Sequence, residues 1–279
     1  MKISAILPNY NYARFMRGRL KEVLSQTFPV TEIIILDDAS TDESKEIINS
    51  EIEELREKKP ELTCKVIFNK ENSGNVFSQW QKGIKEASGN YIWIAELDDS
   101  AKPEFLKTVL SPIEKDKDIV LSYTDSDPIG EISKKDKLRK GLDNIRRHHA
   151  QRSYIVDGKT ELNKNLAVFN SIPNVSACVF KNLPELPELL ENSKSFKLAG
   201  DWAFYIELSK RGKIARSGES LNFHRLSKSS VTGKTNLADR FLEIQRIHKS
   251  LINEEFITAS TKKRMKRSEA SLRKAWHLA

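Results

Sequence analysis

Long apolar runs are absent from this chain of 279 residues, and none approaches the roughly 20 residues that a helix needs to cross a bilayer. The first apolar segment is broken at Pro8, which is too early for the apolar core of a signal peptide. Cysteine is also scarce, because Cys64 and Cys178 are the only two and their spacing fits no metal site. We therefore expect two reduced core thiols in a cytoplasmic protein, and contact with the inner face of the membrane stays open.

Aromatic residues do not alternate with the cations in the two most basic segments. Segment 134–152 holds eight Lys/Arg against two Asp/Glu, and segment 261–279 holds seven against one. Together they contribute +12, so the remainder carries about −4 within the net charge of +8. Without alternating aromatic residues there is no stacking platform for a single nucleic-acid strand, so we expect no nucleic-acid partner. An anionic membrane surface, a phosphate-bearing ligand and plain solvation each explain the charge.

Strand and helix patterns alternate along the first 125 residues. Short apolar runs predict five strands, at 3–7, 32–36, 64–68, 91–94 and 119–123. Apolar residues recur at helical spacing between them, and Ser40 with Glu43 forms a capping box that predicts a helix start. This alternation predicts an α/β fold, with a mostly parallel sheet covered by helices on both faces.

The regular alternation ends after residue 127. Segment 130–158 is polar and basic, which predicts a helical or mobile insertion. The elements expected after it are a strand at 176–180, a helix at 199–210, a short edge strand at 221–225 and a basic helix from 236 onward. We therefore expect one domain at 1–232, with halves at 1–125 and 126–232, and a basic helical extension at 233–279. The alternatives for this extension are contact with a membrane and contact with a partner domain.

Acidic residues follow two of the predicted strands at the point where each strand ends. Asp37 and Asp38 come after the second strand, and Glu96 and Asp98 come after the fourth. In open parallel sheets, ligands bind outside the carboxyl ends of the strands. Carboxylates two residues apart on an extended segment point the same way and can share a hard cation with phosphate oxygens. The two corners therefore fit a nucleoside and a metal-bound diphosphate; the alternative for the first corner is that both acids only cap a helix.

Two more groups of polar residues lie at the ends of predicted elements. Pro8, Asn9 and Tyr10 follow the first strand, where a tyrosine and an amide can hold a nucleobase, although an Asn/Pro turn explains them as well. Asp201 lies near the start of the helix at 199–210, where an acid is first of all a cap. If that helix faces the crevice, Asp201 is the natural general base for a hydroxyl group.

These pieces occur in an order and spacing that resembles the glycosyltransferases of family 2, which have the GT-A fold. The resemblance covers residues 1–232 and rests mainly on Pro8-Asn9-Tyr10-Asn11, Asp37-Asp38-Ala39-Ser40-Thr41-Asp42, Asn72-Ser73-Gly74-Asn75, Glu96-Leu97-Asp98-Asp99 and Gly200-Asp201-Trp202. It implies a GT-A fold with a nucleotide-sugar-binding half and an acceptor-binding half. It also implies an inverting transfer of a hexosyl or deoxyhexosyl group from a nucleotide diphospho-sugar to a saccharide or lipid-linked saccharide, in surface polysaccharide synthesis.

The resemblance also implies a role for each matching residue. Asp98 would coordinate a divalent metal, Mn²⁺ or Mg²⁺, and Asp201 would be the base. Lys82 would supply charge to the phosphates, because many relatives carry an arginine in that part of the motif. The donor-binding residues implied are Pro8, Asn9, Tyr10, Asp37, Asp38, Asn72, Gly74, Lys82, Glu96 and Asp98. The expected acceptor-binding residues are Asn174 and Trp202; the alternative for the segment around Asn174 is an ordinary turn before a strand.

Besides the missing arginine near Lys82, the chain departs from the family pattern at two functional positions. Glu96 stands where the metal-binding motif usually has aspartate, and Ser227 stands where relatives often have histidine. If that histidine helps to bind the diphosphate or the metal, either His224 or Arg225 substitutes for it or metal binding is weaker. These departures leave open a catalytically degenerate nucleotide-sugar-binding module that scaffolds a larger synthase. A nucleic-acid-binding protein is the rival from another class; it predicts steeply salt-dependent binding and leaves the acids after the buried strands unexplained.

Overall fold

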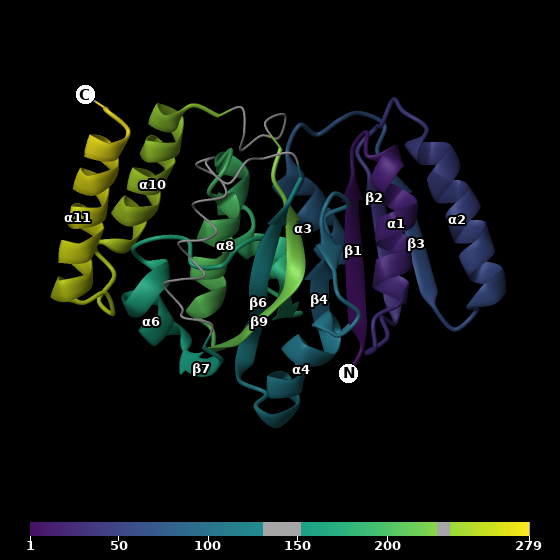
Figure 1. The fold of residues 1–279 in the computed structure, drawn as a ribbon, viewed down its shortest axis with the longest axis horizontal. Helices are drawn as coiled ribbons and strands as arrows, with labels where there is room; N and C mark the ends of the chain where they lie inside the picture. Colours follow the sequence, from purple (N-terminus) through teal and green to yellow (C-terminus); the bar gives the residue numbers. More distant parts are fainter. Residues whose placement is uncertain (131–151, 228–234, 279) are drawn as a thin grey trace.

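The protein is described here by a computed structural model that covers residues 1–130, 152–227 and 235–278. These residues form one sheet of nine strands in the order β3-β2-β1-β4-β8-β6-β9-β5, and β7 pairs with β9 (Figure 1). The strands are β1 Ile3–Asn9, β2 Glu32–Asp37, β3 Thr63–Phe68, β4 Tyr91–Ile94, β5 Ser100–Ala101, β6 Ile119–Ile129, β7 Tyr154–Asp157, β8 Cys178–Lys181 and β9 Lys213–Arg225. The insertion expected at 130–158 falls largely outside the described residues.

Helices cover both faces of the sheet, and the two C-terminal helices lie at one end of the molecule (Figure 1). The α-helices are α1 Ala13–Leu24, α2 Ser44–Lys58, α3 Val76–Glu86, α4 Phe105–Lys115, α6 Gly158–Glu161, α7 Leu186–Leu189, α8 Gly200–Ser209, α10 Leu237–Leu251 and α11 Ala259–Ala275. Short turns of π- or 3₁₀-helix occupy Leu162–Leu166, Val175–Ala177 and Asn192–Ser195. No helix among the described residues is both long and apolar enough to cross a membrane.

The first half of the sheet is parallel, as the alternation of strands and helices predicts. β3, β2, β1 and β4 pair in register with a helix between successive strands. Side chains alternate between the two faces of a strand. Ile6 and Ile34 therefore pack against α3, whereas Leu7 and Ile35 pack on the face covered by α1 and α2. Both faces are buried, which is why these strands read as nearly continuous apolar runs.

The second half of the sheet is mixed. β8 lies antiparallel between β4 and β6, and β9 runs parallel to β6 but antiparallel to β5 and β7. The prediction of a short edge strand at 221–225 is wrong, because these residues end a strand of 13 residues that has neighbours on both sides. Both cysteines are free; Cys178 is buried, but Cys64 is only half-buried in the outermost strand β3.

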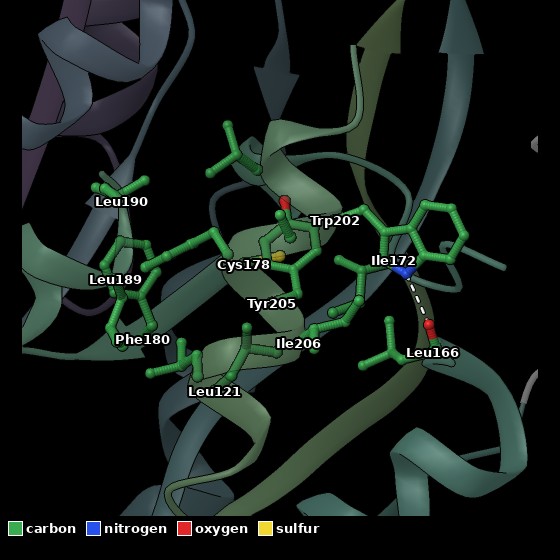
Figure 2. Packing of buried hydrophobic residues seen from close by; sticks show 14 of the residues in the cluster. Leu121, Leu166, Ile172, Cys178, Phe180, Leu189, Leu190, Trp202, Tyr205 and Ile206 are labelled. Atoms are coloured by element: carbon green, nitrogen blue, oxygen red, sulfur yellow. Dashed lines mark hydrogen bonds between the residues drawn. The ribbon is translucent and has the colours of Figure 1, made fainter. Parts of the chain in front are cut away.

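The two C-terminal helices share their core with the second half of the sheet. Ile247 and Leu251 of α10 and Met265 of α11 belong to the same buried cluster as Trp202 and Ile206 of α8. Figure 2 shows the centre of that cluster, where α8 packs over β6 and β8. Along the long axis of the molecule, α8 lies between the helix pair α10–α11 and the parallel strands (Figure 1).

A buried ion pair joins the two longest strands. Arg216 Nη2 of β9 lies 2.6 Å from Asp125 Oδ1 of β6, and their side chains are 0% and 1% exposed. We expect Arg216→Ala to lower the free energy of unfolding by about 3–5 kcal/mol, because it leaves a buried carboxylate without its partner. Denaturant titration measures this, with Lys213→Ala as the control on the same strand. Lys213 pairs with Asp116 at the surface, so less than about 1 kcal/mol should be lost there; equal losses would contradict the prediction.

Candidate active site

An open cleft of about 960 Å³ lies at the carboxyl ends of β1 and β4. Its walls come from the loop before α3, the start of α8, the end of β9, and the helices α10 and α11. Of the thirteen predicted site residues, eleven line it: Pro8, Asn9, Tyr10, Asp38, Asn72, Gly74, Glu96, Asp98, Asn174, Asp201 and Trp202. Asp37 and Lys82 do not. The fold therefore brings residues separated by almost 200 positions in the sequence into one cleft.

Asp37 is buried and does not line the cleft, so its contact with a nucleoside stays a prediction. Its Oδ2 accepts a hydrogen bond of 2.5 Å from Asn9, and its Oδ1 accepts one of 3.0 Å from the Ser40 backbone N–H. These bonds fix the ends of β1 and β2 relative to each other. Asp37 therefore shapes the corner and does not line it.

Asp38 does line the cleft, but it also holds the loop that follows β3. Its carboxylate accepts hydrogen bonds from Asn69 at 2.6 Å, from the Ser73 hydroxyl at 2.7 Å and from Gln79 at 2.9 Å. This loop carries Gly74, whose φ of +63° lies in the left-handed region that favours glycine. The acid thus positions the loop at the cleft edge.

Lys82 is the second predicted residue that does not line the cleft. It lies on α3, and its Nζ donates a hydrogen bond to Asn69 Oδ1 at 2.5 Å. Asn69 in turn donates to Asp38 in the cleft wall, so Lys82 is linked to the cleft through one residue. Lys197 and Arg240 are cations that do line the cleft. The contact of Lys82 with a phosphate stays a prediction.

Glu96 and Asp98 form the acidic centre of the cleft. Burial, followed by repulsion from Asp98, raises the pKa of Glu96 to about 8, although the Trp80 indole N–H donates to its Oε1 at 2.7 Å. Burial and the neighbouring Asp99 raise the pKa of Asp98 to about 6. Two carboxylates with raised pKa values form a site that a cation would stabilise.

Asp99 and its partners support this acidic centre from behind. The Asn174 amide donates to Asp99 Oδ2 at 2.6 Å, and the Arg225 backbone N–H donates to Asp99 Oδ1 at 2.9 Å. Arg225 also donates from Nε to the Asp98 carbonyl at 2.8 Å. Asn174 is only 8% exposed, and its Oδ1 accepts from Ser126 at 2.8 Å. Its amide thus holds Asp99 and Ser126 together, while the contact of Asn174 with an acceptor stays a prediction.

Asp201 is the second residue of α8 and faces the cleft. Burial raises its pKa to about 6, in opposition to hydrogen bonds from the Trp202 backbone N–H at 2.6 Å and from Asn170 at 3.3 Å. Trp202 also lines the cleft. Its indole N–H donates to the Leu166 carbonyl at 2.7 Å, as Figure 2 shows, and the residue is only 4% exposed. The indole N–H is therefore engaged within the protein, and the contact of Trp202 with an acceptor stays a prediction.

The start of α8 is fixed by a residue that the sequence patterns did not single out. Glu243 of α10 accepts three backbone N–H groups with its carboxylate, from Lys197 at 2.6 Å, Leu198 at 2.9 Å and Ala199 at 2.8 Å. These N–H groups belong to the last residues before α8, with Ala199 as its N-cap. The carboxylate thus anchors the segment that leads into α8, whose second residue is the candidate base Asp201.

His224 is the strongest candidate among the substitutes considered for Ser227. It lines the cleft, and its Nδ1 is buried without a hydrogen-bond partner among the described residues. His224 lowers the pKa of both Asp98 and Asp201, which shows that it lies near both carboxylates. The described residues contain no group of three or more His, Cys, Asp or Glu that could hold a metal alone. Asp98 and His224 therefore fit a divalent cation only if a ligand such as a diphosphate completes its coordination.

Comparison with known proteins agrees with this geometry. The profile of Glycosyl transferase family 2 matches residues 4–169. The glycosyltransferase GlyG of Streptococcus pneumoniae is 32% identical over 130 residues, which are 45% of this chain and 41% of GlyG. An uncharacterized glycosyltransferase of Nostoc sp. is 34% identical over 110 residues, which are 39% of this chain and 32% of that protein. The chain thus spans less than half the length of these two relatives.

Two solved structures resemble the fold. TarS of Staphylococcus aureus, residues 1–349 with UDP-GlcNAc, has a TM-score of 0.70 at 18% identity, over 99% of this chain and 73% of that chain. The mannosyltransferase PcManGT of Pyrobaculum calidifontis, with GDP-Man and Mn²⁺, has a TM-score of 0.64 at 16% identity, over 100% of this chain and 70% of that chain. The expected GT-A fold is confirmed by this likeness. Because its family profile covers more than half of the sequence, the chain belongs to glycosyl transferase family 2.

Proposed function

We propose that this chain transfers a hexosyl or deoxyhexosyl group, with inversion, from a nucleotide diphospho-sugar to a hydroxyl of a saccharide or lipid-linked saccharide in surface polysaccharide synthesis. The observation that carries the proposal is that Asp98 and Asp201 line one cleft, although the sequence separates them by about a hundred residues. The family membership supports sugar transfer, and the neighbours crystallised with UDP-GlcNAc and GDP-Man support a nucleotide-sugar donor.

Each side of the cleft takes one part of the reaction. Tyr10 is 47% exposed at the end of β1, where its ring is available to stack on the donor base. Asp98 and His224 would hold a divalent cation, Mn²⁺ or Mg²⁺. That cation would neutralise the diphosphate as it leaves. Glu96 lies between these groups and the sheet, beside the expected position of the ribose and sugar.

Asp201 acts on the attacking hydroxyl, on the side of the anomeric carbon opposite the diphosphate. Its carboxylate accepts the proton of the attacking hydroxyl, while that oxygen forms a bond to the anomeric carbon of the donor sugar. The bond from this carbon to the diphosphate oxygen breaks, and the electron pair leaves with the diphosphate. Attack from the face opposite the leaving group inverts the configuration at that carbon.

The proposal is tested by thermal unfolding with UDP, GDP, dTDP and CMP, each with and without Mn²⁺. One nucleotide should stabilise the protein, and more strongly with Mn²⁺; at a hundred times its Kd the gain is about 2.7 kcal/mol. The matching nucleotide sugar should then be turned over with an acceptor. Binding without any turnover would favour the scaffold module, and no response to any nucleotide would overturn the proposal.

The outer face of α11 supports a cytoplasmic location at the inner face of the membrane. Lys263, Lys266, Arg267, Arg273 and Lys274 are exposed on this helix. Each such cation near an anionic lipid surface contributes on the order of 1 kcal/mol of attraction. We therefore propose that 233–279 makes a peripheral contact with the membrane. The catalytic domain is proposed to be 1–232.

A further inference from the structure

The cleft has an apolar wall that the proposed reaction does not yet use. Five residues form it, and we call them the C-terminal wall: Val168, Phe169, Ile244, Leu272 and Trp276. Ile244 comes from α10, and Leu272 and Trp276 come from the end of α11. The other two precede the loop that carries Asn170.

The wall lies on the side of Asp201 away from the donor corner. The corner is formed by residues after β1 and β4, and α8 lies between these strands and the pair α10–α11 (Figure 1). Asp201 is the second residue of α8 and lines the cleft. A group bound against the wall would therefore approach Asp201 from the side opposite to the donor. That is the side from which the attacking hydroxyl must come.

The wall is built into the fold and is not a chance exposure of apolar side chains. On α11, Ser268, Leu272 and Trp276 recur every four residues and line the cleft, whereas Met265 on the same side of the helix is buried at 1% exposure. His248 of α10 links both α11 and Val168 of the wall. Its ring nitrogens lie 2.7 Å from Glu269 of α11 and 3.1 Å from the Val168 carbonyl. Leu272 and Trp276 remain partly exposed.

Cations flank the apolar wall. Arg240 lies one turn before Ile244 on α10, and the Lys197 backbone N–H donates to Glu243 of the same helix. Both cations line the cleft. Glu243 lines it too, but its carboxylate is engaged by the three backbone N–H groups before α8. An aliphatic and aromatic surface beside two cations matches a ligand with an apolar chain and an anionic group.

We propose that the C-terminal wall is a subsite for an amphiphilic acceptor, in which an apolar chain joined through a phosphate carries the sugar that is extended. The chain packs against Trp276 and Leu272, and the phosphate lies near Lys197. This inference rests on the proposed function and narrows its acceptor to the lipid-linked class.

The test measures binding of n-dodecyl phosphate and ethyl phosphate by calorimetry, below the micelle concentration of the longer probe. Wild type should bind dodecyl phosphate at least about 10²-fold more tightly than ethyl phosphate, because the extra methylenes are buried. Trp276→Ala should weaken dodecyl phosphate binding by about tenfold or more. Lys197→Ala should weaken it several-fold. Leu242→Ala is the matched control, because this α10 leucine is 61% exposed and lies outside the cleft lining.

Several results would overturn the inference. Equal binding of the two probes to wild type would exclude an apolar subsite, and so would an unchanged affinity in Trp276→Ala. An equal loss in Leu242→Ala would indicate detergent-like binding to the surface. The nucleotide panel on the same preparations separates this inference from the proposed function. A normal nucleotide response without selective dodecyl phosphate binding removes only the acceptor subsite. Selective dodecyl phosphate binding without any nucleotide response removes the proposed function, and with it the subsite's role as an acceptor site.

Discussion

Asp201→Asn is expected to lower turnover by about 10²–10⁴-fold while leaving nucleotide binding unchanged, because an amide cannot accept the proton of the attacking hydroxyl. The substitution keeps the shape of the side chain and an oxygen for the Trp202 backbone N–H. The measurement is the initial rate of nucleoside diphosphate release at saturating donor and acceptor. Glu207→Gln is the matched control, since it makes the same change on α8 where Glu207 pairs with Lys210 at the surface. Full turnover in Asp201→Asn would exclude Asp201 as the base.

The pH dependence of turnover gives an independent reading of the same residue. Burial raises the pKa of Asp201 to about 6, and the base works only in its ionised form. Turnover should therefore be constant at higher pH and fall as the pH drops through about 6. The residual rate of Asp201→Asn should lack that inflection. Saturating donor and Mn²⁺ are needed, because Asp98 has a similar pKa and its protonation would weaken donor binding.

Asp98→Asn is expected to lower kcat/KM by on the order of 10²-fold or more and to abolish the dependence of donor binding on Mn²⁺. An amide carries no charge, so it neither attracts the cation nor helps to offset the diphosphate. Titration of Mn²⁺ against nucleotide stabilisation measures the effect.

Glu96→Gln is the informative companion to Asp98→Asn. It replaces the carboxyl group beside Asp98 with an amide and keeps the side-chain length and an oxygen for the Trp80 indole N–H. Because Asp98 is the proposed ligand, Glu96→Gln should retain the Mn²⁺ dependence. Loss of that dependence in Glu96→Gln and its survival in Asp98→Asn would reverse the two roles.

Local patterns predicted the parallel half of the sheet and the acidic centre well. Strand periodicity decides which face a residue joins, and the ends of parallel strands meet at one edge, so Asp98 and Tyr10 fall in one cleft. Local patterns did not predict the hydrogen-bond partner of a side chain that can reach groups on more than one segment. The capping box of Ser40 does not form; the Ser40 hydroxyl instead accepts from Asn9 and from the Asn11 backbone N–H, and α2 begins only at Ser44.

The missed residues depend on contacts between distant segments. Asp37 and Asp38 are adjacent, yet one points into the turn and the other into the cleft, and only the paired strands decide which. Glu243 has ordinary helical surroundings in the sequence. Its role arises because α10 packs beside the segment before α8, a contact between residues more than 40 positions apart. No pattern within one helix contains that information.

The three hydrogen bonds from the backbone of 197–199 to Glu243 limit which segments can be exchanged between this chain and a relative without loss of contacts. The segment shared with the family profile ends at residue 169, so the proposed base Asp201 and Glu243 both lie beyond it. A chimera that exchanged α10 for a helix without a carboxylate at position 243 would leave the three N–H groups before α8 without their acceptor. An exchange that begins before α8 and includes α10 would keep both sides of this contact together.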